Sequence, residues 1–157
     1  MRMVYKVLAY VVAGLVMVQA AAIAFAQFGL MAWIEQGGTL DAAAMQSDDV
    51  SFTGVAGYMI HGMFGEMVIP IVVLLLLISS FFARTTGAVK WALIVVVTTA
   101  VQVTLGLLAD GAPALGILHG AGALVLFGSA IMAGMRAKAT GAPAEDASTE
   151  PAAVPVS

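Results

Sequence analysis

Four long apolar runs dominate this sequence and limit the folds that it can adopt. A bilayer is crossed by about 20 consecutive apolar residues in a helix, and the 157 residues are 62% hydrophobic and only 10% charged. Two of the three connections between the runs are tight, so neighbouring helices are expected to be antiparallel. The sequence therefore predicts an all-α, integral membrane, antiparallel four-helix bundle with up-down-up-down order. The predicted spans cover about residues 5–34, 56–82, 89–108 and 114–135.

The remaining segments are a long connection and a polar tail. The connection between the first two runs carries Gly37-Gly38 and several acids, and its piece from Leu40 to Met45 is predicted to form a helical turn at the membrane surface. Residues 139–157 are rich in Ala, Pro, Ser, Thr and acids, which is typical of a disordered tail. The chain is thus divided into a four-helix transmembrane domain, residues 1–138, and a disordered cytoplasmic tail.

The basic residues predict the orientation of the helices. All six lie at one side of the four spans, whereas the opposite connections hold only acids. By the positive-inside rule both termini lie in the cytoplasm, and the protein is a multi-pass protein of a bacterial-type cell (inner) membrane surrounded by lipid. The net charge of −3 gives no nucleic-acid footprint. The basic residues are Arg2, Lys6, Arg84, Lys90, Arg136 and Lys138.

The first run also has features of a cleaved signal peptide, because it follows two bases and contains Ala24-Phe25-Ala26-Gln27. The apolar stretch continues to Ile34 and is long for such a peptide. An uncleaved first helix is therefore the favoured prediction, and an intact mass would distinguish the two.

Two histidines, the only ones in the chain, lie inside apolar runs. An imidazole in hydrocarbon is costly and usually has a partner. His61 and His119 belong to the second and fourth spans, which are diagonal in such a bundle, and both fall in its outer third, roughly 25 to 30 Å above the cytoplasmic ends. Facing helices are where bundles hold cofactors. We therefore expect His61 and His119 to be the axial ligands of one haem iron.

Composition and spacing restrict the type of cofactor and leave alternatives. The chain has no cysteine, so a haem would be b-type and non-covalent. The histidines could instead only pack or hydrogen-bond, or serve a proton relay or another metal. A zinc or copper site usually needs three or four ligands at one depth, and only nearby methionines could complete one here.

Several neighbours of the histidines are candidate cofactor contacts. Glycines next to each histidine would give a flat macrocycle room, although small residues also serve helix packing alone. Gln27 is a candidate partner for an imidazole N–H, and Tyr58, one turn from His61, is an interfacial anchor and a weaker pocket candidate. The glycines are Gly62, Gly65, Gly120 and Gly122.

Glu66 is the other residue that is costly inside a membrane. It follows His61 by five positions, which turns it well away around an ideal helix, and it precedes Pro70 by one turn. It is a candidate proton-linked or quinone-binding group. The alternative is an acid that is hydrogen-bonded across the bundle, with the candidate partners Gln19, Gln102, Thr98 and Thr99.

Glutamines in the first and third spans suggest an internal repeat. Gln19 and Gln102 lie at similar distances from a preceding lysine, and each of these spans is followed by one that carries a His-Gly pair. The sequence therefore suggests two helical hairpins with the same pattern of polar residues. A sequence with so few polar residues could also show this pattern by chance. Both glutamines are predicted to hydrogen-bond between helices, nearer the midplane than the histidines.

These motifs resemble those of a known family. Val18-Gln19, Ile60-His61-Gly62, Val101-Gln102 and Gly116-Ile117-Leu118-His119, within about residues 4–137, are similar to motifs of small bacterial four-helix membrane proteins of unassigned function. The pattern also resembles one half of haem A synthase, which holds haem between even-numbered helices. The resemblance implies His61 and His119 as axial ligands. Gly62 and Gly120 stand where the synthases usually have an arginine.

The resulting hypothesis is a membrane b-type cytochrome-like protein with one haem, for electron transfer or haem handling, rather than an enzyme. A redox partner or a homo-oligomer would be its partner. The alternatives are a haem-free subunit or scaffold of a larger complex and a small proton-linked transporter that uses Glu66.

Overall fold

The computed structural model describes residues 1–46, 50–109 and 111–137, and this part of the chain is helical, without a β-strand. Within it, four helices are long and apolar enough to cross a membrane, as expected of a multi-pass membrane protein. The tail predicted to be disordered lies outside the described residues.

The long helices agree with the predicted spans to within about three residues. The second span is continuous but consists of three pieces, with one π-helical turn between two α-helical segments. The elements are α1 (Arg2–Glu35), α3 (Ala56–Met63), the π-turn η1 (Phe64–Val68), α4 (Ile69–Phe82), α5 (Ala88–Ala109) and α6 (Ala114–Met135).

The long connection contains the short helix α2 (Ala42–Gln46), close to the helical turn predicted there. The Asp41 Oδ1 atom accepts a hydrogen bond of 2.7 Å from the backbone N–H of Ala44. This contact satisfies one of the amides that a helix start leaves without a partner. Before this connection, α1 is followed by Gly37 at a φ of 95°, a conformation that glycine adopts without a Cβ clash.

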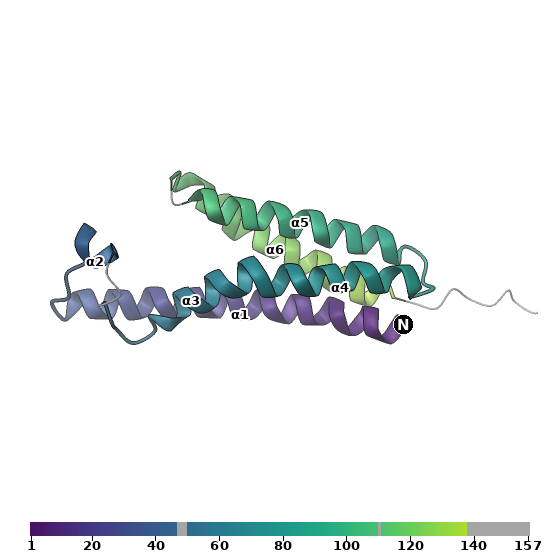
Figure 1. Ribbon diagram of the computed structural model, residues 1–157, viewed down its shortest axis with the longest axis horizontal. Helices are drawn as coiled ribbons and strands as arrows, with labels where there is room; N and C mark the ends of the chain where they lie inside the picture. The colour runs from purple at the N-terminus through teal and green to yellow at the C-terminus, as the bar shows by residue number, and fades with distance from the viewer. Residues whose placement is uncertain (47–49, 110, 138–157) are drawn as a thin grey trace, which may run out of the picture.

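Each long helix packs against two neighbours. Helix α1 contacts α4 and α6, and α5 contacts the same two helices, so the second span and α6 are diagonal, as predicted. Successive long helices run in opposite directions (Figure 1). The N-terminus, the turn from α4 to α5 and the end of α6 therefore share one end of the bundle.

The hydrophobic core is confined to the half of the bundle that includes the N-terminus. Tyr5 is its largest fully buried side chain, and its hydroxyl donates a hydrogen bond of 3.1 Å to the carbonyl of Ala88. Many other members are small, which lets the helices approach closely. The small members are Ala9, Ala13, Ala83, Ala88, Ala92, Ala130 and Ala133, and the larger ones include Val12, Val73, Leu76 and Val95.

The other half of the bundle is open between its two hairpins. Helices α5 and α6 diverge from α1 and α3 toward the end that carries α2 (Figure 1). The last buried residue of α5 is Thr99, and the first buried residue of α6 is Leu126. No described residue of α5 or α6 between these points and the turn that joins the two helices is buried.

One close helix crossing holds the open half of the first hairpin together. Gly57 is the only buried residue of α3, and a Cβ there would overlap the carbonyl of Ala22 and lie 3.0 Å from the Ala26 Cβ. Three small residues thus bring α3 against α1. The crossing lies one helical turn before His61 and fixes the height of that side chain beside α1.

Candidate functional site

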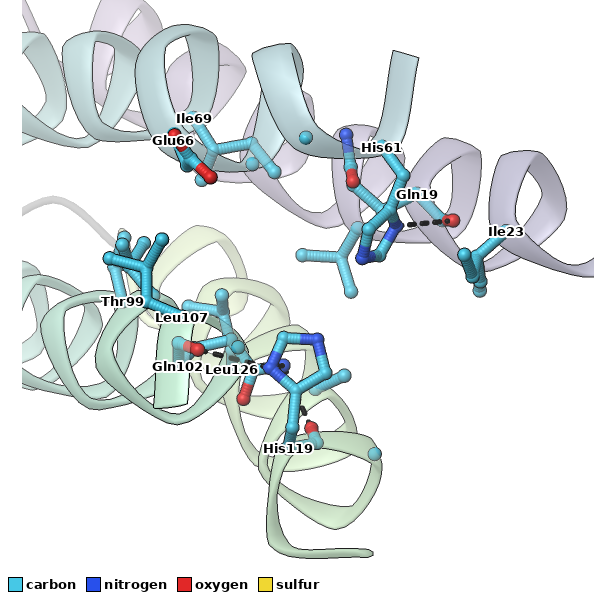
Figure 2. A pocket seen from close by; sticks show the side chains of 18 of the residues that line it. Gln19, Ile23, His61, Glu66, Ile69, Thr99, Gln102, Leu107, His119 and Leu126 are labelled. Carbon is cyan, nitrogen blue, oxygen red and sulfur yellow. Dashed lines mark hydrogen bonds between the residues drawn. The ribbon is translucent and has the colours of Figure 1, made fainter. Parts of the chain in front are cut away.

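A cavity of about 380 Å³ occupies the open half of the bundle (Figure 2). All four spans contribute to its walls, which are mostly apolar. Its volume is within the range of small-molecule sites, about 300 to 1,000 Å³. Both histidines line it, together with Gln19, Gln102, Gly62, Gly65, Gly120, Glu66 and Thr99.

His61 and His119 point toward one another across this cavity (Figure 2). Their ring centroids are 6.0 Å apart and the ring planes are inclined by 72°. Both side chains are half-buried. The sequence prediction that the two imidazoles converge from diagonal helices agrees with this geometry.

The first hairpin determines which nitrogen of His61 is free. Its Nδ1 lies 3.2 Å from the main-chain oxygen of Gln19, and a carbonyl only accepts hydrogen bonds. Nδ1 must therefore carry the proton, and Nε2 of the neutral ring has an unprotonated lone pair. Among the described residues Nε2 makes no hydrogen bond, so it is available to a ligand in the cavity.

The second hairpin holds His119 in the same way. Its Nδ1 lies 3.0 Å from the main-chain oxygen of Gln102 and 3.1 Å from the Nε2 atom of that residue. The amide nitrogen has a closer acceptor, the carbonyl of His119, at 2.8 Å. The ring therefore donates from Nδ1 to the carbonyl of Gln102, which again leaves the ring Nε2 unprotonated.

The two hairpins thus repeat one arrangement. In each, a glutamine carbonyl accepts from an imidazole Nδ1, and the glutamine amide donates to a carbonyl of the histidine's helix. On α1, Gln19 donates to Ile60 over 3.4 Å, one residue earlier than on the other side. The internal repeat seen in the sequence therefore extends to hydrogen bonds around the cavity.

The prediction that Gln27 is the hydrogen-bond partner of an imidazole is wrong. Gln27 is exposed and makes no hydrogen bond to either histidine among the described residues. Gln19 and Gln102 were expected nearer the midplane, yet they lie beside the histidines and supply their partners. Their predicted interhelical hydrogen bonds are confirmed.

The four candidate glycines have two different surroundings. A Cβ at Gly62 or Gly120 would meet nothing within 4 Å, and both residues line the cavity. Gly65 and Gly122 face glutamine amides: added Cβ atoms would lie 3.6 Å from Gln19 Oε1 and 2.5 Å from Gln102 Oε1. The first two leave room for a ligand, and Gly122 leaves room for a glutamine.

Tyr58 is not among the residues that line the cavity. It packs edge-on against Phe52, with ring centroids 6.3 Å apart, and Phe52 stacks on Trp33 at 6.0 Å. This aromatic cluster at the α2 end of the bundle agrees with an interfacial anchor. No described contact joins Tyr58 to either histidine.

The π-helical turn changes the position of Glu66. An ideal α-helix turns residue i+5 well away from residue i, whereas i→i+5 is the hydrogen-bonding period of a π-helix. The η1 turn begins just after His61, and its register includes a bond from the Ile69 amide to the Phe64 carbonyl. Glu66 consequently lines the same cavity as His61, contrary to the orientation expected from the sequence.

The predicted interhelical hydrogen bonds of Glu66 are also absent. The side chain is exposed and forms no hydrogen bond or ion pair with any described residue, including Gln19, Gln102, Thr98 and Thr99. Its carboxyl group is therefore available to a molecule in the cavity or in the surrounding membrane.

Three buried polar atoms around the cavity have no hydrogen-bond partner in the described part of the chain. They are Gln19 Oε1, Gln102 Oε1 and Thr99 Oγ1. Buried polar atoms are nearly always hydrogen-bonded. Their gathering around one cavity is typical of a site for a ligand.

Comparisons with protein-family models, with curated proteins and with solved structures give no match to this chain. The resemblance to one half of haem A synthase therefore stays an expectation, and the cavity itself is the basis for assigning a function.

Proposed function

We propose that this protein is a small integral membrane b-type cytochrome that holds one haem between His61 and His119. The observation that carries the proposal is the pair of facing imidazoles, whose Nε2 atoms make no hydrogen bond with any residue that the structure describes. Both rings are already oriented as ligands, because each Nδ1–H is held by a main-chain carbonyl. Such a hydrogen bond fixes the tautomer and raises the basicity of the ligating nitrogen.

The spacing of the rings fits one metal ion between them. Bonds of about 2.0–2.1 Å between a metal and each imidazole nitrogen place the two nitrogens about 4 Å apart and the ring centres about 6 Å apart. The observed centroid separation is 6.0 Å. Rotation about the common axis leaves the angle between the ring planes free, so 72° is compatible with this arrangement.

The donor set favours haem over a bare metal ion. The described residues contain no group of three or more His, Asp or Glu side chains that could hold a metal. Two opposed nitrogens match a metal whose other four positions are supplied by a macrocycle. The apolar walls and the open space at Gly62 and Gly120 would accept such a flat ring.

The site would suit electron transfer or haem handling. A bound haem supplies one-electron chemistry at its iron, and two axial histidines leave no open position for oxygen. The carbonyls of Gln19 and Gln102 would keep both rings oriented in either oxidation state. The apolar walls would exclude water and influence the reduction potential.

The distribution of charge supports an outward-facing site. The bases of the described residues lie at the end of the bundle away from the cavity, so the positive-inside rule assigns both termini to the cytoplasm. The haem would then lie in the outer half of a bacterial-type cell membrane. A redox partner or a second copy would reach it from that side.

The experiment is a spectroscopic titration of the purified protein with haemin. We expect a low-spin, six-coordinate ferric spectrum and a sharp reduced-minus-oxidised α-band. His61→Ala and His119→Ala should each lose this signature, and added imidazole should restore it if the role is ligation. Tyr58→Phe, outside the cavity, is the control. A wild-type protein without this band would favour a haem-free bundle that serves as a subunit of a larger complex.

A further inference from the structure

A second, apolar groove adjoins the histidine cavity at Thr99. It measures about 280 Å³, lies between α4 and α5, and shares Thr99 and Val103 with the histidine cavity. Pro70 and Leu74 are among its other residues, and Leu74 is 54% exposed on the outer surface of the bundle. In a bilayer this surface faces the acyl chains, so the groove offers a lateral path from lipid into the cavity.

The hydroxyl of Thr99 is unusual among those of the membrane helices. Ser79, Ser80, Thr98, Thr104 and Ser129 each donate to a carbonyl three or four residues earlier in their own helix. Thr99 is only 5% exposed, yet its Oγ1 has no partner among the described residues. A buried hydroxyl without a partner lies where the groove meets the cavity.

Glu66 provides a second polar group in the same part of the cavity. Figure 2 shows Glu66 and Thr99 on different walls, both toward the end away from the imidazole rings. Glu66 belongs to η1 in the second span and Thr99 to α5, and both line the histidine cavity, which the groove adjoins at Thr99. A small molecule that entered from the lipid would meet the carboxyl group of Glu66 on one side and the hydroxyl group of Thr99 on the other.

We propose that Glu66 and Thr99 bind the head group of a lipid-soluble quinone or quinol, which enters between α4 and α5. The apolar groove fits a hydrophobic tail, and the two polar groups fit the ring oxygens. A carboxylate can accept the proton of a quinol hydroxyl, and the threonine hydroxyl can donate to the opposite ring oxygen. The π-turn is the local device that directs Glu66 into this site.

The proposed redox role of this site rests on the proposed function. Oxidation of one quinol to quinone releases two electrons and two protons. A haem held by the two histidines would supply a one-electron acceptor, and a one-electron carrier protein would take each electron from it before the next arrives. Glu66 accepts the protons one at a time and releases each to water before the next. Binding of the carrier requires only Glu66, Thr99 and the groove, so it can be tested without haem.

The test measures binding of decylubiquinone to the purified full chain in detergent micelles by isothermal titration, with the His61→Ala/His119→Ala double variant as the haem-free form. We expect saturable binding to both. Glu66→Gln and Thr99→Val should each weaken it at least tenfold. Thr98→Val is the matched control, because the Thr98 hydroxyl is bonded within α5, and its affinity should stay within twofold of the wild type.

Two outcomes would overturn the inference: no saturable binding of decylubiquinone to the wild type, or equal affinities of Thr99→Val and Thr98→Val.

A second measurement links the site to the haem. Decylubiquinol should reduce the haem at least tenfold more slowly in Glu66→Gln, while the dithionite-reduced spectrum stays unchanged. Decylubiquinone binding without any haem spectrum would support the quinone site and contradict the cytochrome proposal. A haem spectrum without decylubiquinone binding would support the cytochrome proposal and contradict the quinone site.

Discussion

The imidazole of His119 rests on the backbone of Gly106. A Cβ at this glycine would lie 3.0 Å from the ring Cε1 and 3.2 Å from Nδ1. Gly106 is one helical turn after Gln102, whose carbonyl accepts the hydrogen bond from the same Nδ1. One face of α5 thus supplies both the hydrogen-bond partner of the ring and the surface that it contacts.

Substitution of Gly106 by alanine should therefore disturb the ligand without unfolding the bundle. We expect Gly106→Ala to displace the ring by a few tenths of an ångström and to weaken haem binding about tenfold, which is ~1.4 kcal/mol. Haemin titration measures this. The control is Gly128→Ala on α6, where a Cβ would meet nothing within 4 Å. Equal haem affinities of the two variants would show that the contact does not position His119.

The glutamines should contribute to stability more than to ligand orientation. Gln19→Leu and Gln102→Leu remove the amide groups but keep the carbonyls that hold the rings. Each loses one interhelical hydrogen bond, worth about 0.6 kcal/mol on average in membranes and up to ~1.7 kcal/mol. Gln102→Leu should cost more, because its bond is 2.8 Å long and that of Gln19 is 3.4 Å.

Unfolding in mixed micelles with increasing SDS measures these free energies, and Gln27→Leu, at an exposed position, is the control. The six-coordinate haem spectrum should persist in both variants. If Gln102→Leu folds but loses the spectrum, the amide rather than the carbonyl orients His119.

The helices and the histidine pair could be predicted because both follow from the bilayer. Its thickness determines the length of a span, and its low polarity makes two isolated imidazoles conspicuous. Diagonal placement of the second and fourth spans then follows from short turns. The cytoplasmic side of the bundle and the disordered tail stay predictions from the positions of the basic residues and from composition.

The partners of the histidines depend on features that residue counting does not include. Counting residues along straight helices places Gln27 rather than Gln19 at the depth of His61. The crossing at Gly57 determines the actual stagger of α3 against α1. A regular α-helix would turn Glu66 away from His61, and the π-helical turn η1 changes that period. A π-turn has no sequence signature as clear as an apolar run, although Pro70 indicated an irregularity nearby.

Filling the cavity should separate haem binding from folding. Gly62→Leu and Gly120→Leu both place a large side chain where a Cβ meets nothing within 4 Å, on residues that line the cavity. We expect unchanged or higher stability, because leucine favours helix over glycine by up to about 1 kcal/mol. Haem affinity should fall more than tenfold, because the side chain occupies the volume of the ring.

Gly14→Leu is the matched control for this pair. Its Cβ would also meet nothing within 4 Å, but Gly14 does not line the cavity. Its haem affinity should equal that of the wild type. Normal haem binding by Gly62→Leu and Gly120→Leu would show that the haem lies outside this cavity.

The crossing at Gly57 should control the geometry of His61 from a distance. A valine there overlaps the carbonyl of Ala22 and crowds Ala26, so α3 must move away from α1. Overpacking of this kind costs about 1–3 kcal/mol, and the shift should lengthen the 3.2 Å contact between His61 Nδ1 and the Gln19 carbonyl. The contacts of His119 come from the other hairpin and should persist.

Gly57→Val should consequently yield a destabilised protein whose haem loses one axial ligand and becomes partly high-spin, measurable by electron paramagnetic resonance. Met59→Val is the control, because Met59 is 70% exposed on the same helix. A Gly57→Val protein that is less stable but keeps a fully low-spin haem would mean that His61 is held by the cofactor itself and not by the crossing of α1 and α3.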